Sequence, residues 1–246
     1  MGYEADSQGI INRFIRVEGA WDEHLSNTRN FILQSMAGKK TRNVAVYGSG
    51  WLLDLPLDEI TDRAEHVWLY DVIHPSQVIH KLRRYKNITL VNADVTGNVL
   101  TRVYEAVQDF QNKGIRPQIA SLCQGSFFPE ANPDFSVSLN ILSQLGDLVS
   151  VYLSKNIPLT TEEKELMTQM LQLSHLELLS RQPSCLISDV QENVYDRFDQ
   201  LTATKELIKC ILPEARHSSS WIWKFDPLGE YHPGMKTFLT VAALEL

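Results

Sequence analysis

The sequence contains few cysteines, and none of them belongs to a motif. Cys123, Cys185 and Cys210 are widely spaced and form no C-x-x-C pair. An odd number of separated cysteines indicates neither a disulfide framework nor a zinc site. It fits a reducing compartment instead. We therefore expect a protein without a metal site that is located in the cytoplasm.

Positive charge is also scarce. The chain has 23 Lys and Arg against 30 Asp and Glu, which gives a net charge of −7. A protein that binds nucleic acid normally presents a basic face. The densest basic run, residues 81–86, falls on a predicted helix, where a solvated helix face explains it. A nucleic-acid partner is therefore not expected.

Long hydrophobic runs are absent. No run approaches the roughly 18 apolar residues that a membrane span needs. The N-terminus lacks the basic-then-apolar pattern of a signal peptide, and Asp6 stands where the myristoylation motif requires Ser or Thr. These features predict a soluble protein without membrane contact, and no feature of the sequence indicates its oligomeric state.

What the sequence does contain is alternation between short β-rich runs and helical patterns. With 246 residues and 43% hydrophobic content, the chain is large enough for one α/β domain with a full core. The pattern predicts βα units in a mostly parallel, doubly wound sheet over residues 43–246. Parallel strands are expected at 43–47, 66–72, 88–92, 135–140 and 184–190. Helices are expected after Pro56, from Pro75 to about Tyr85, over 98–113, from Asn140 to Leu153, over 160–180 and over 202–212. Residues 114–133 are expected to be a loop, with at most a short strand near 119–123.

Residues 1–42 form a helical segment ahead of the sheet. Trp21, Leu25, Ile32 and Met36 recur at helical spacing, and Gly38 is a suitable stop. We expect this segment to be a cap on the domain formed by residues 43–246. Together with residues 114–133 and 226–235, it is where we expect specificity for a substrate to be determined, because loops on a rigid scaffold vary most.

The chain ends in two strand-like runs without a helix between them, residues 218–225 and 236–246. They are therefore expected to pair antiparallel. Trp221, Trp223 and Phe225 alternate and project to one face. We expect a helix of the same chain to cover that face. Residues 238–246 are apolar on both faces and are expected to lie between the fifth strand and the Trp-bearing strand.

Polar residues or glycines stand at the ends of the first four strands. Gly48 and Gly50 bracket Ser49 after the first strand, and Asp71 ends the second. In an open parallel sheet, ligands bind beyond the carboxyl ends of the strands. Asp71 follows Gly50 by about the 20 residues at which an acidic side chain accepts the hydroxyls of a ribose. The alternative for Asp71 is a helix cap before Pro75.

Asp94 and Asn140 occupy the corresponding places after the third and fourth strands. Asp94 is suited to accept a hydrogen bond from an exocyclic amine such as that of adenine, and an Asx turn into Thr96 is the alternative. Asn140 would lie at the reacting end of the same ligand, and it is also a suitable N-cap for the next helix.

This series of strand ends resembles the class I S-adenosylmethionine-dependent methyltransferases. The resemblance covers about residues 42–246 and includes the closing antiparallel pair. It implies a seven-stranded sheet, S-adenosylmethionine as cofactor and methyl transfer to a small-molecule acceptor. It places the glycines near the methionine part, Asp71 on the ribose, Asp94 on the adenine and Asn140 near the sulfonium. The cofactor residues that it implies are Gly48, Ser49, Gly50, Asp71, Val72, Asp94, Val95 and Asn140.

The sequence departs from the family pattern in the first loop. Leu52 occupies the position of the family's third glycine, no acidic residue precedes Gly48, and Pro56 predicts a late or short first helix. No NPPY-type motif follows the fourth strand, so methylation of adenine or of a glutamine amide is not indicated. Two alternatives stay open: a non-catalytic cofactor-binding or interaction module of the same fold, and an NAD-dependent oxidoreductase, which would also be expected to have the third glycine.

A methyltransferase of this kind needs few catalytic groups. The sulfonium is an activated leaving group, so positioning of the acceptor is the main task, and a base is needed only where the acceptor loses a proton. The candidate bases are His24, His217 and His232, with Glu230 beside the last. For each of them, a packing or surface role is the alternative.

Overall fold

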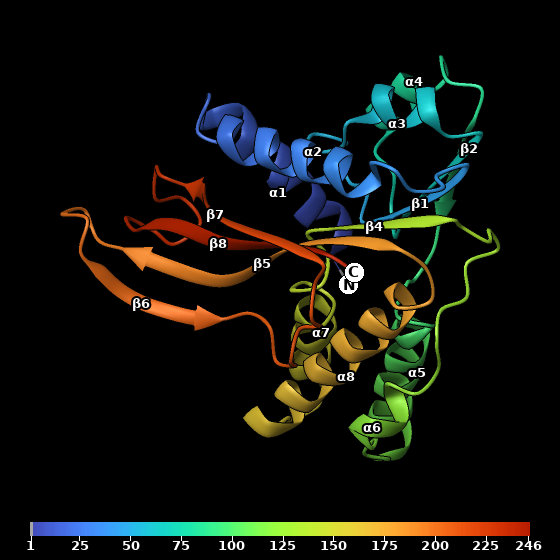
Figure 1. Cartoon of the computed structure of the whole chain (residues 1–246). Helices are drawn as coiled ribbons and strands as arrows, with labels where there is room; N and C mark the ends of the chain where they lie inside the picture. The colour runs from blue at the N-terminus through green and yellow to red at the C-terminus, as the bar shows by residue number, and fades with distance from the viewer. Residues whose placement is uncertain (1) are drawn as a thin grey trace.

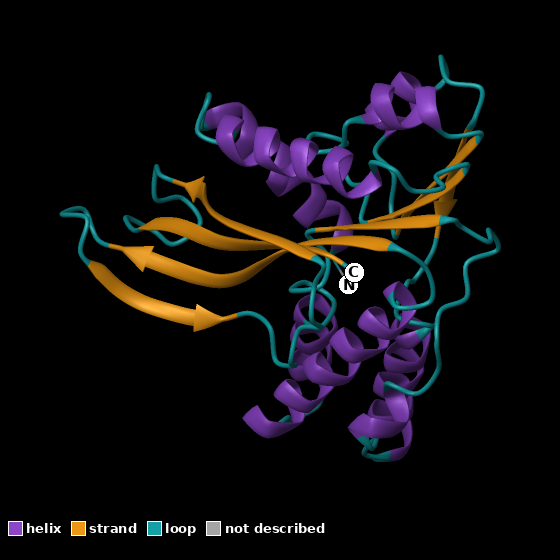
Figure 2. Cartoon of the chain, in the orientation of Figure 1, coloured by secondary structure: helices purple, strands orange, loops and turns teal. Residues whose placement is uncertain are grey.

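The computed structural model describes residues 2–246 and contains one sheet with helices on both faces (Figure 1, Figure 2). Its strand order is β3-β2-β1-β4-β5-β8-β7, and β6 pairs with β5 off this path. The strands are β1 (Asn43–Tyr47), β2 (His66–Asp71), β3 (Ile88–Asn92), β4 (Phe135–Leu139), β5 (Ser184–Tyr195), β6 (Leu201–Glu206), β7 (His217–Asp226) and β8 (Lys236–Glu245). Neighbours from β3 to β5 are parallel, and the other pairs are antiparallel. The mostly parallel, doubly wound fold predicted from the sequence is confirmed.

The strand order reverses between β1 and β4. The chain runs outward from β1 through β2 to β3 and then returns to the other side of β1 with β4. Helices that follow β1 and β4 leave the sheet on opposite faces, and in open α/β sheets ligands bind beyond the carboxyl ends of two such strands. We call the region beyond the carboxyl ends of β1 and β4 the crevice. The residues that follow β1 and β4 therefore border the expected ligand site.

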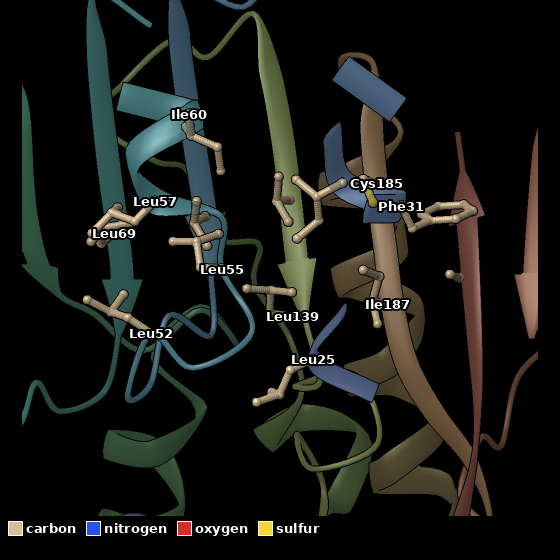
Figure 3. Close-up of a cluster of buried hydrophobic side chains, with 14 of the residues drawn as sticks. Leu25, Phe31, Leu52, Leu55, Leu57, Ile60, Leu69, Leu139, Cys185 and Ile187 are labelled. Atoms are coloured by element: carbon tan, nitrogen blue, oxygen red, sulfur yellow. The ribbon is translucent and has the colours of Figure 1, made fainter. Parts of the chain in front are cut away.

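The helices form two layers around the sheet. They are α1 (Tyr3–Arg16), α2 (Asp22–Met36), α3 (Leu57–Arg63), α4 (Ser76–Leu82), α5 (Val99–Lys113), α6 (Ile119–Leu122), α7 (Asp147–Asn156) and α8 (Thr161–Leu179). α2, α3 and α4 lie on one face, and α5 to α8 lie on the other (Figure 1). In β1, Val44 and Val46 point into the first layer, while Ala45 and Tyr47 point into the second. Figure 3 shows part of the first core, where Leu25 and Ile60 approach strand residues such as Leu139.

The aromatic face of β7 is covered by α2, as expected. The ring centroid of Trp21, at the start of α2, lies 4.8 Å from that of Trp223 and 5.8 Å from that of Phe225. The indole N–H of Trp21 donates to the carbonyl oxygen of Phe225 over 3.0 Å. β8 lies between β5 and β7, which is also the predicted position. The residues of α2 are thus part of the first core.

The sheet has eight strands rather than seven, because the predicted helix over 202–212 is wrong. Residues 201–206 form β6, which pairs antiparallel with the extended second half of β5. β-branched Thr202 and Thr204 alternate there, and their hydroxyls bond to Val194 O and Asn193 Oδ1, each over 3.0 Å. These cross-strand hydrogen bonds outweigh the helix propensity of the residues that follow in the sequence.

Two other predictions also need correction. The segment near 119–123 is the short helix α6 rather than a strand, and its buried residues Ile119 and Leu122 are three positions apart, a helical spacing. The helix after β4 begins at Asp147, not directly after Asn140, because a turn from Ile141 to Gly146 comes first.

Local sequence features account for the ends and the buried faces of three helices. Thr160 and Glu163 form the capping box of α8, with both reciprocal hydrogen bonds present. Val99, Val103 and Val107 form the buried face of α5. α3, the helix that follows β1, begins only at Leu57 and has seven residues, so it is both late and short, as Pro56 predicted. Among residues 2–246, no helix combines the length and the apolar character that crossing a membrane requires.

Candidate functional site

The loop after β1 keeps an unusual backbone at three alternate positions. The φ angles are 80° at Gly48, 45° at Gly50 and 58° at Leu52. Glycine adopts this left-handed region freely, but leucine rarely does. Leu52 stands at the position of the family's third glycine, and its backbone has the conformation that glycine would favour. Its buried side chain, 3% exposed, contributes to the first core and offsets the strain.

Gly48 is required by close packing. A Cβ atom at this position would lie 2.0 Å from Cγ2 of Ile141 and 2.5 Å from the carbonyl oxygen of Leu139. The loop after β1 and the exit of β4 therefore touch through a position that admits no side chain. This contact fixes the two walls of the crevice relative to each other.

Asp71 connects the ends of β1 and β2. Its Oδ2 accepts the N–H of Gly50 over 2.8 Å, and its Oδ1 accepts the N–H of Ile73 over 3.4 Å. Burial raises the pKa of this carboxyl, and the N–H of Gly50 opposes the rise. Asp71 does not cap α4, which has no side-chain cap bond. Its two oxygens provide about four lone-pair sites, so the carboxylate retains acceptor capacity for a ligand.

Asp94 makes local hydrogen bonds, in agreement with the Asx turn that was its alternative interpretation. Its Oδ1 accepts the N–H and the hydroxyl of Thr96, the former over 2.9 Å, and its Oδ2 accepts the N–H of Leu100 over 2.9 Å. The carboxylate thus forms an Asx turn and holds the first turn of α5. Val72 and Val95 follow β2 and β3 and are half-buried. The contact of Asp94 and Val95 with adenine stays a prediction.

Asn140 forms a pair with a residue that sequence reasoning missed. Its backbone is left-handed, with φ 48°. Its Nδ2 donates to Oδ2 of Asp54 over 2.8 Å, and burial raises the pKa of that carboxyl. Asp54 lies in the loop after β1, where the only available signal was an acidic residue between apolar neighbours. The pair bridges the crevice at the point where the strand order reverses.

Two buried polar atoms at this point have no hydrogen-bond partner. They are Oγ of Ser49, in a residue that is 1% exposed, and Oδ1 of Asn140, in a residue that is 9% exposed. A buried polar atom without a partner costs about 1–3 kcal/mol. Eleven other buried side-chain atoms of the described residues are in the same state, and what distinguishes this pair is its place at the reversal of the strand order. Both atoms adjoin the positions where the resemblance places the methionine part and the sulfonium of the cofactor. The residues at the crevice therefore fit a polar ligand.

His24 is not a catalytic candidate in this structure. Its ring is 1% exposed and stacks on Trp223 with 4.0 Å between centroids. The indole N–H of Trp221 donates to its Nδ1 over 3.1 Å, and burial lowers its pKa to about 3. His217 begins β7 at the opposite edge of the sheet and stacks on Phe31. His24 is therefore a packing residue without access for an acceptor, whereas His217 is exposed but lies at the end of the sheet away from the carboxyl ends of the parallel strands.

His232 is the candidate base in the loop between β7 and β8, at the end of the sheet where the parallel strands have their carboxyl ends. The carboxylate of Asp226 accepts the N–H groups of Leu228, Glu230 and Tyr231 and so shapes the loop between β7 and β8. His232 Nε2 lies 3.0 Å from Oε1 of Glu192, a residue of β5. Glu230, the other candidate, forms an ion pair with Arg16. The His232–Glu192 pair is therefore the arrangement at this edge that suits proton transfer.

Metal chemistry has no evident site here. Among residues 2–246, no group of three or more His, Cys, Asp or Glu side chains is placed to hold a metal ion. Two shallow hollows occur on the described surface, one lined by Ser154, Lys155 and Lys164 and one along α2 near Glu59, and neither includes a strand-end residue.

No protein-family model matches the chain, and no curated protein sequence matches it. Solved structures are similar to it at low identity. The N-methyltransferase NodS from Bradyrhizobium japonicum WM9, in complex with S-adenosylhomocysteine, is 12% identical, with 94% of this chain and 90% of that chain covered and a TM-score of 0.48. The 1,6-didemethyltoxoflavin-N1-methyltransferase from Burkholderia thailandensis is 12% identical, with 99% and 89% covered and a TM-score of 0.44. The 23S rRNA methyltransferase ErmE is 13% identical, with 90% and 68% covered and a TM-score of 0.35. The strand order and the antiparallel closing strands of this chain agree with the mostly parallel, doubly wound sheet and the closing antiparallel pair expected from the sequence.

Proposed function

We propose that the crevice beyond β1, β2 and β4 binds S-adenosylmethionine and that the protein transfers its methyl group to a small-molecule acceptor. The observation that carries this proposal is the pair of unpartnered, buried polar atoms, Ser49 Oγ and Asn140 Oδ1, at the reversal of the strand order. Ligands of open α/β sheets bind at such a reversal.

The residues around the crevice divide by the part of the cofactor that they suit. Asn140 Oδ1 and the carboxylate of Asp54 are acceptors and suit the ammonium group of the methionine part. Asp71 suits the ribose hydroxyls through its remaining lone pairs. Val72 and Val95 suit the two sides of the adenine, beside Asp94.

The protein's part in the reaction is positioning and proton transfer. The bound sulfonium supplies an activated methyl group, so the protein has to align the acceptor and exclude water. His232 accepts a proton from an acceptor that must lose one, and Glu192 orients the imidazole through the 3.0 Å contact.

A small-molecule acceptor fits the charge of the chain. The net charge of −7 provides no basic footprint for a nucleic acid. The loop between β7 and β8 and the helix α1 contact each other through the Arg16–Glu230 ion pair, so a polymer would have to displace them, whereas a compact acceptor would not.

The non-catalytic alternative has two kinds of observation in its favour. The oxygens of Asp71 and Asp94 already accept backbone N–H groups, and the Ile141 side chain lies against Gly48. A module that keeps the fold for binding or for interaction would show these features as well. The two functions differ in turnover, which is absent in the alternative.

Calorimetric titration with S-adenosylmethionine, S-adenosylhomocysteine and NAD tests the proposal. We expect both sulfur ligands to bind and NAD not to bind. Ser49→Ala should lower the affinity for S-adenosylhomocysteine about three- to tenfold, since a hydrogen bond contributes about 0.5–1.5 kcal/mol. Ser35→Ala is the matched control, because Ser35 Oγ is also buried without a partner but lies on α2.

The control variant should bind like the unaltered protein. Absence of binding of either sulfur ligand at millimolar concentration would refute the proposal, and tighter binding of NAD would favour an oxidoreductase. Binding without turnover of any tested amine or hydroxyl acceptor would favour the non-catalytic module.

A further inference from the structure

The helix α1 runs along the row of strand ends. Its 14 residues span about 20 Å at 1.5 Å per residue. From β3 to β8, five gaps between neighbouring strands add up to about 24 Å at 4.8 Å each. The helix is therefore about as long as the row of ends that borders the crevice, and its contacts show that it lies along that row.

The first half of α1 lies against the ends of β3 and β1. Partial burial, with the nearby carboxylates of Asp94 and Asp6, raises the pKa of Tyr3. The carbonyl oxygen of Ser7 accepts the indole N–H of Trp51, in the loop after β1, over 2.8 Å. The beginning of α1 therefore contacts the loop after β1, and Tyr3 lies close enough to Asp94 to be affected by its charge.

The second half of α1 reaches the loop between β7 and β8. The guanidinium of Arg13 lies 4.4 Å from the ring centroid of Phe225 and 4.9 Å from that of Tyr231. Arg16 forms an ion pair with Glu230 in the same loop. These contacts hold α1 between the first strand ends and the loop that carries His232.

α1 is attached more weakly than the neighbouring helix. None of its residues is fully buried, whereas α2 buries seven, among them Phe31 and Ile32. Its apolar residues Ile10 and Phe14 are only partly buried against the first core. Elements with few buried contacts open locally, without unfolding of the whole domain.

We propose that α1 is a strap that closes the crevice and must detach from the strand ends before a ligand is admitted. The identity of that ligand rests on the proposed function, but the detachment of α1 does not. In the closed state, α1 covers the loops of Asp94 and Trp51. Release of the contacts at Ser7 and Arg16 exposes these two loops, while α2 and the sheet stay in place.

Hydrogen exchange of the full-length protein tests the detachment without any ligand. We expect the amides of α1 to exchange by local opening, much faster than those of α2 and β1. Arg16→Ala removes the ion pair and should speed exchange across α1 about two- to fivefold, the range for one exposed pair. Trp51→Phe removes the indole donor and should speed it about three- to tenfold.

Arg42→Ala is the matched control, because Arg42 also forms an exposed ion pair, with Glu65, but lies away from α1. It should leave exchange in α1 unchanged. Exchange of α1 at the same rate as β1 in the unaltered protein would overturn the proposal. Unchanged exchange of α1 in both Arg16→Ala and Trp51→Phe would also overturn the proposal.

The rate of ligand association separates this proposal from the proposed function. In stopped-flow mixing with S-adenosylhomocysteine, Arg16→Ala should raise the association rate constant by the same factor as the exchange rate. Local opening of α1 without binding of S-adenosylhomocysteine would refute the cofactor and retain the strap. Binding at an association rate that no α1 variant alters would refute the strap and retain the cofactor.

Discussion

The carboxylate of Asp71, at the end of β2, accepts the backbone N–H of Gly50, in the loop after β1, over 2.8 Å. A single side chain thus links two adjacent strand ends at the crevice. A ligand that bonds to Asp71 also engages a residue that positions the Gly48–Gly50 loop.

Asp71→Ala should therefore weaken S-adenosylhomocysteine binding at least tenfold. Each charge-assisted hydrogen bond to the carboxylate contributes about 1.5–3 kcal/mol. Calorimetry on the folded variant checks this, with the exposed Asp58→Ala as control. Unchanged affinity in a folded Asp71→Ala protein would restrict Asp71 to holding the loop.

Gly48→Ala should destabilise the fold by about 2–5 kcal/mol, from left-handed strain and a forced contact with Ile141. Gly38→Ala is the control, since Gly38 has φ 70° but nothing within 4 Å of an added Cβ. It should cost only about 1–2 kcal/mol of strain. Urea unfolding measures both, and an equal cost would show that the contact with β4 yields easily.

Trp223→Ala should cost about 3–5 kcal/mol of unfolding free energy, because this residue is 7% exposed between α2 and its own strand. The oligomeric state should not change, since α2 of the same chain covers the ring. Ile222→Ala, on the exposed face of β7, should stay within about 0.5 kcal/mol. A fully stable Trp223→Ala protein with an altered oligomeric state would mean that this face is an interface.

Acid should destabilise the protein through His24. Burial lowers its pKa to about 3 in the folded chain, from an ordinary value of 6.5. Between these values the unfolded chain binds the proton and the folded chain does not. Stability should therefore fall as the pH falls from 6.5 toward 3, by up to about 1.4 kcal/mol per pH unit. His175, whose pKa burial lowers to about 4, acts in the same direction.

Buried carboxyls oppose this trend, because burial raises the pKa of Asp54, Asp71 and Asp147 as well as that of Asp189. Burial raises the pKa of Asp189 to about 6, from 3.8, so protonation in that range favours the folded chain. His24→Gln isolates the histidine contribution, because the amide oxygen of glutamine is also able to accept the Trp221 N–H. Urea titrations between pH 4 and 6.5 should show a smaller pH dependence in His24→Gln. An unchanged pH dependence would assign the effect to other groups.

The parallel part of the fold was predictable because each strand has a local signature. β1 and β3 have the predicted bounds, since their β-rich runs end at glycine or polar residues. β6 was not predictable in the same way. Its residues are all exposed, so no burial pattern marks it, and it pairs with residues 191–195, a part of β5 that lies beyond the strand predicted at 184–190.

The candidate site was predictable in position but not in its internal contacts. The sequence placed Gly50 and Asp71 at neighbouring strand ends, and the structure joins them by a hydrogen bond, since parallel strand ends share one edge. Spacing carried no information on Asp54, which pairs with Asn140 through the fold. The burial of His24 depends on the packing of α2 against β7, which a histidine in a helical pattern does not reveal.

The most direct test of the cofactor site is a crystal structure of the protein grown with millimolar S-adenosylhomocysteine. We expect the ligand to lie beyond the ends of β1 and β4, with hydrogen bonds to Ser49 Oγ and Asn140 Oδ1 and its ribose at Asp71. A ligand bound elsewhere on the chain, or a crevice that remains without ligand under these conditions, would contradict this expectation.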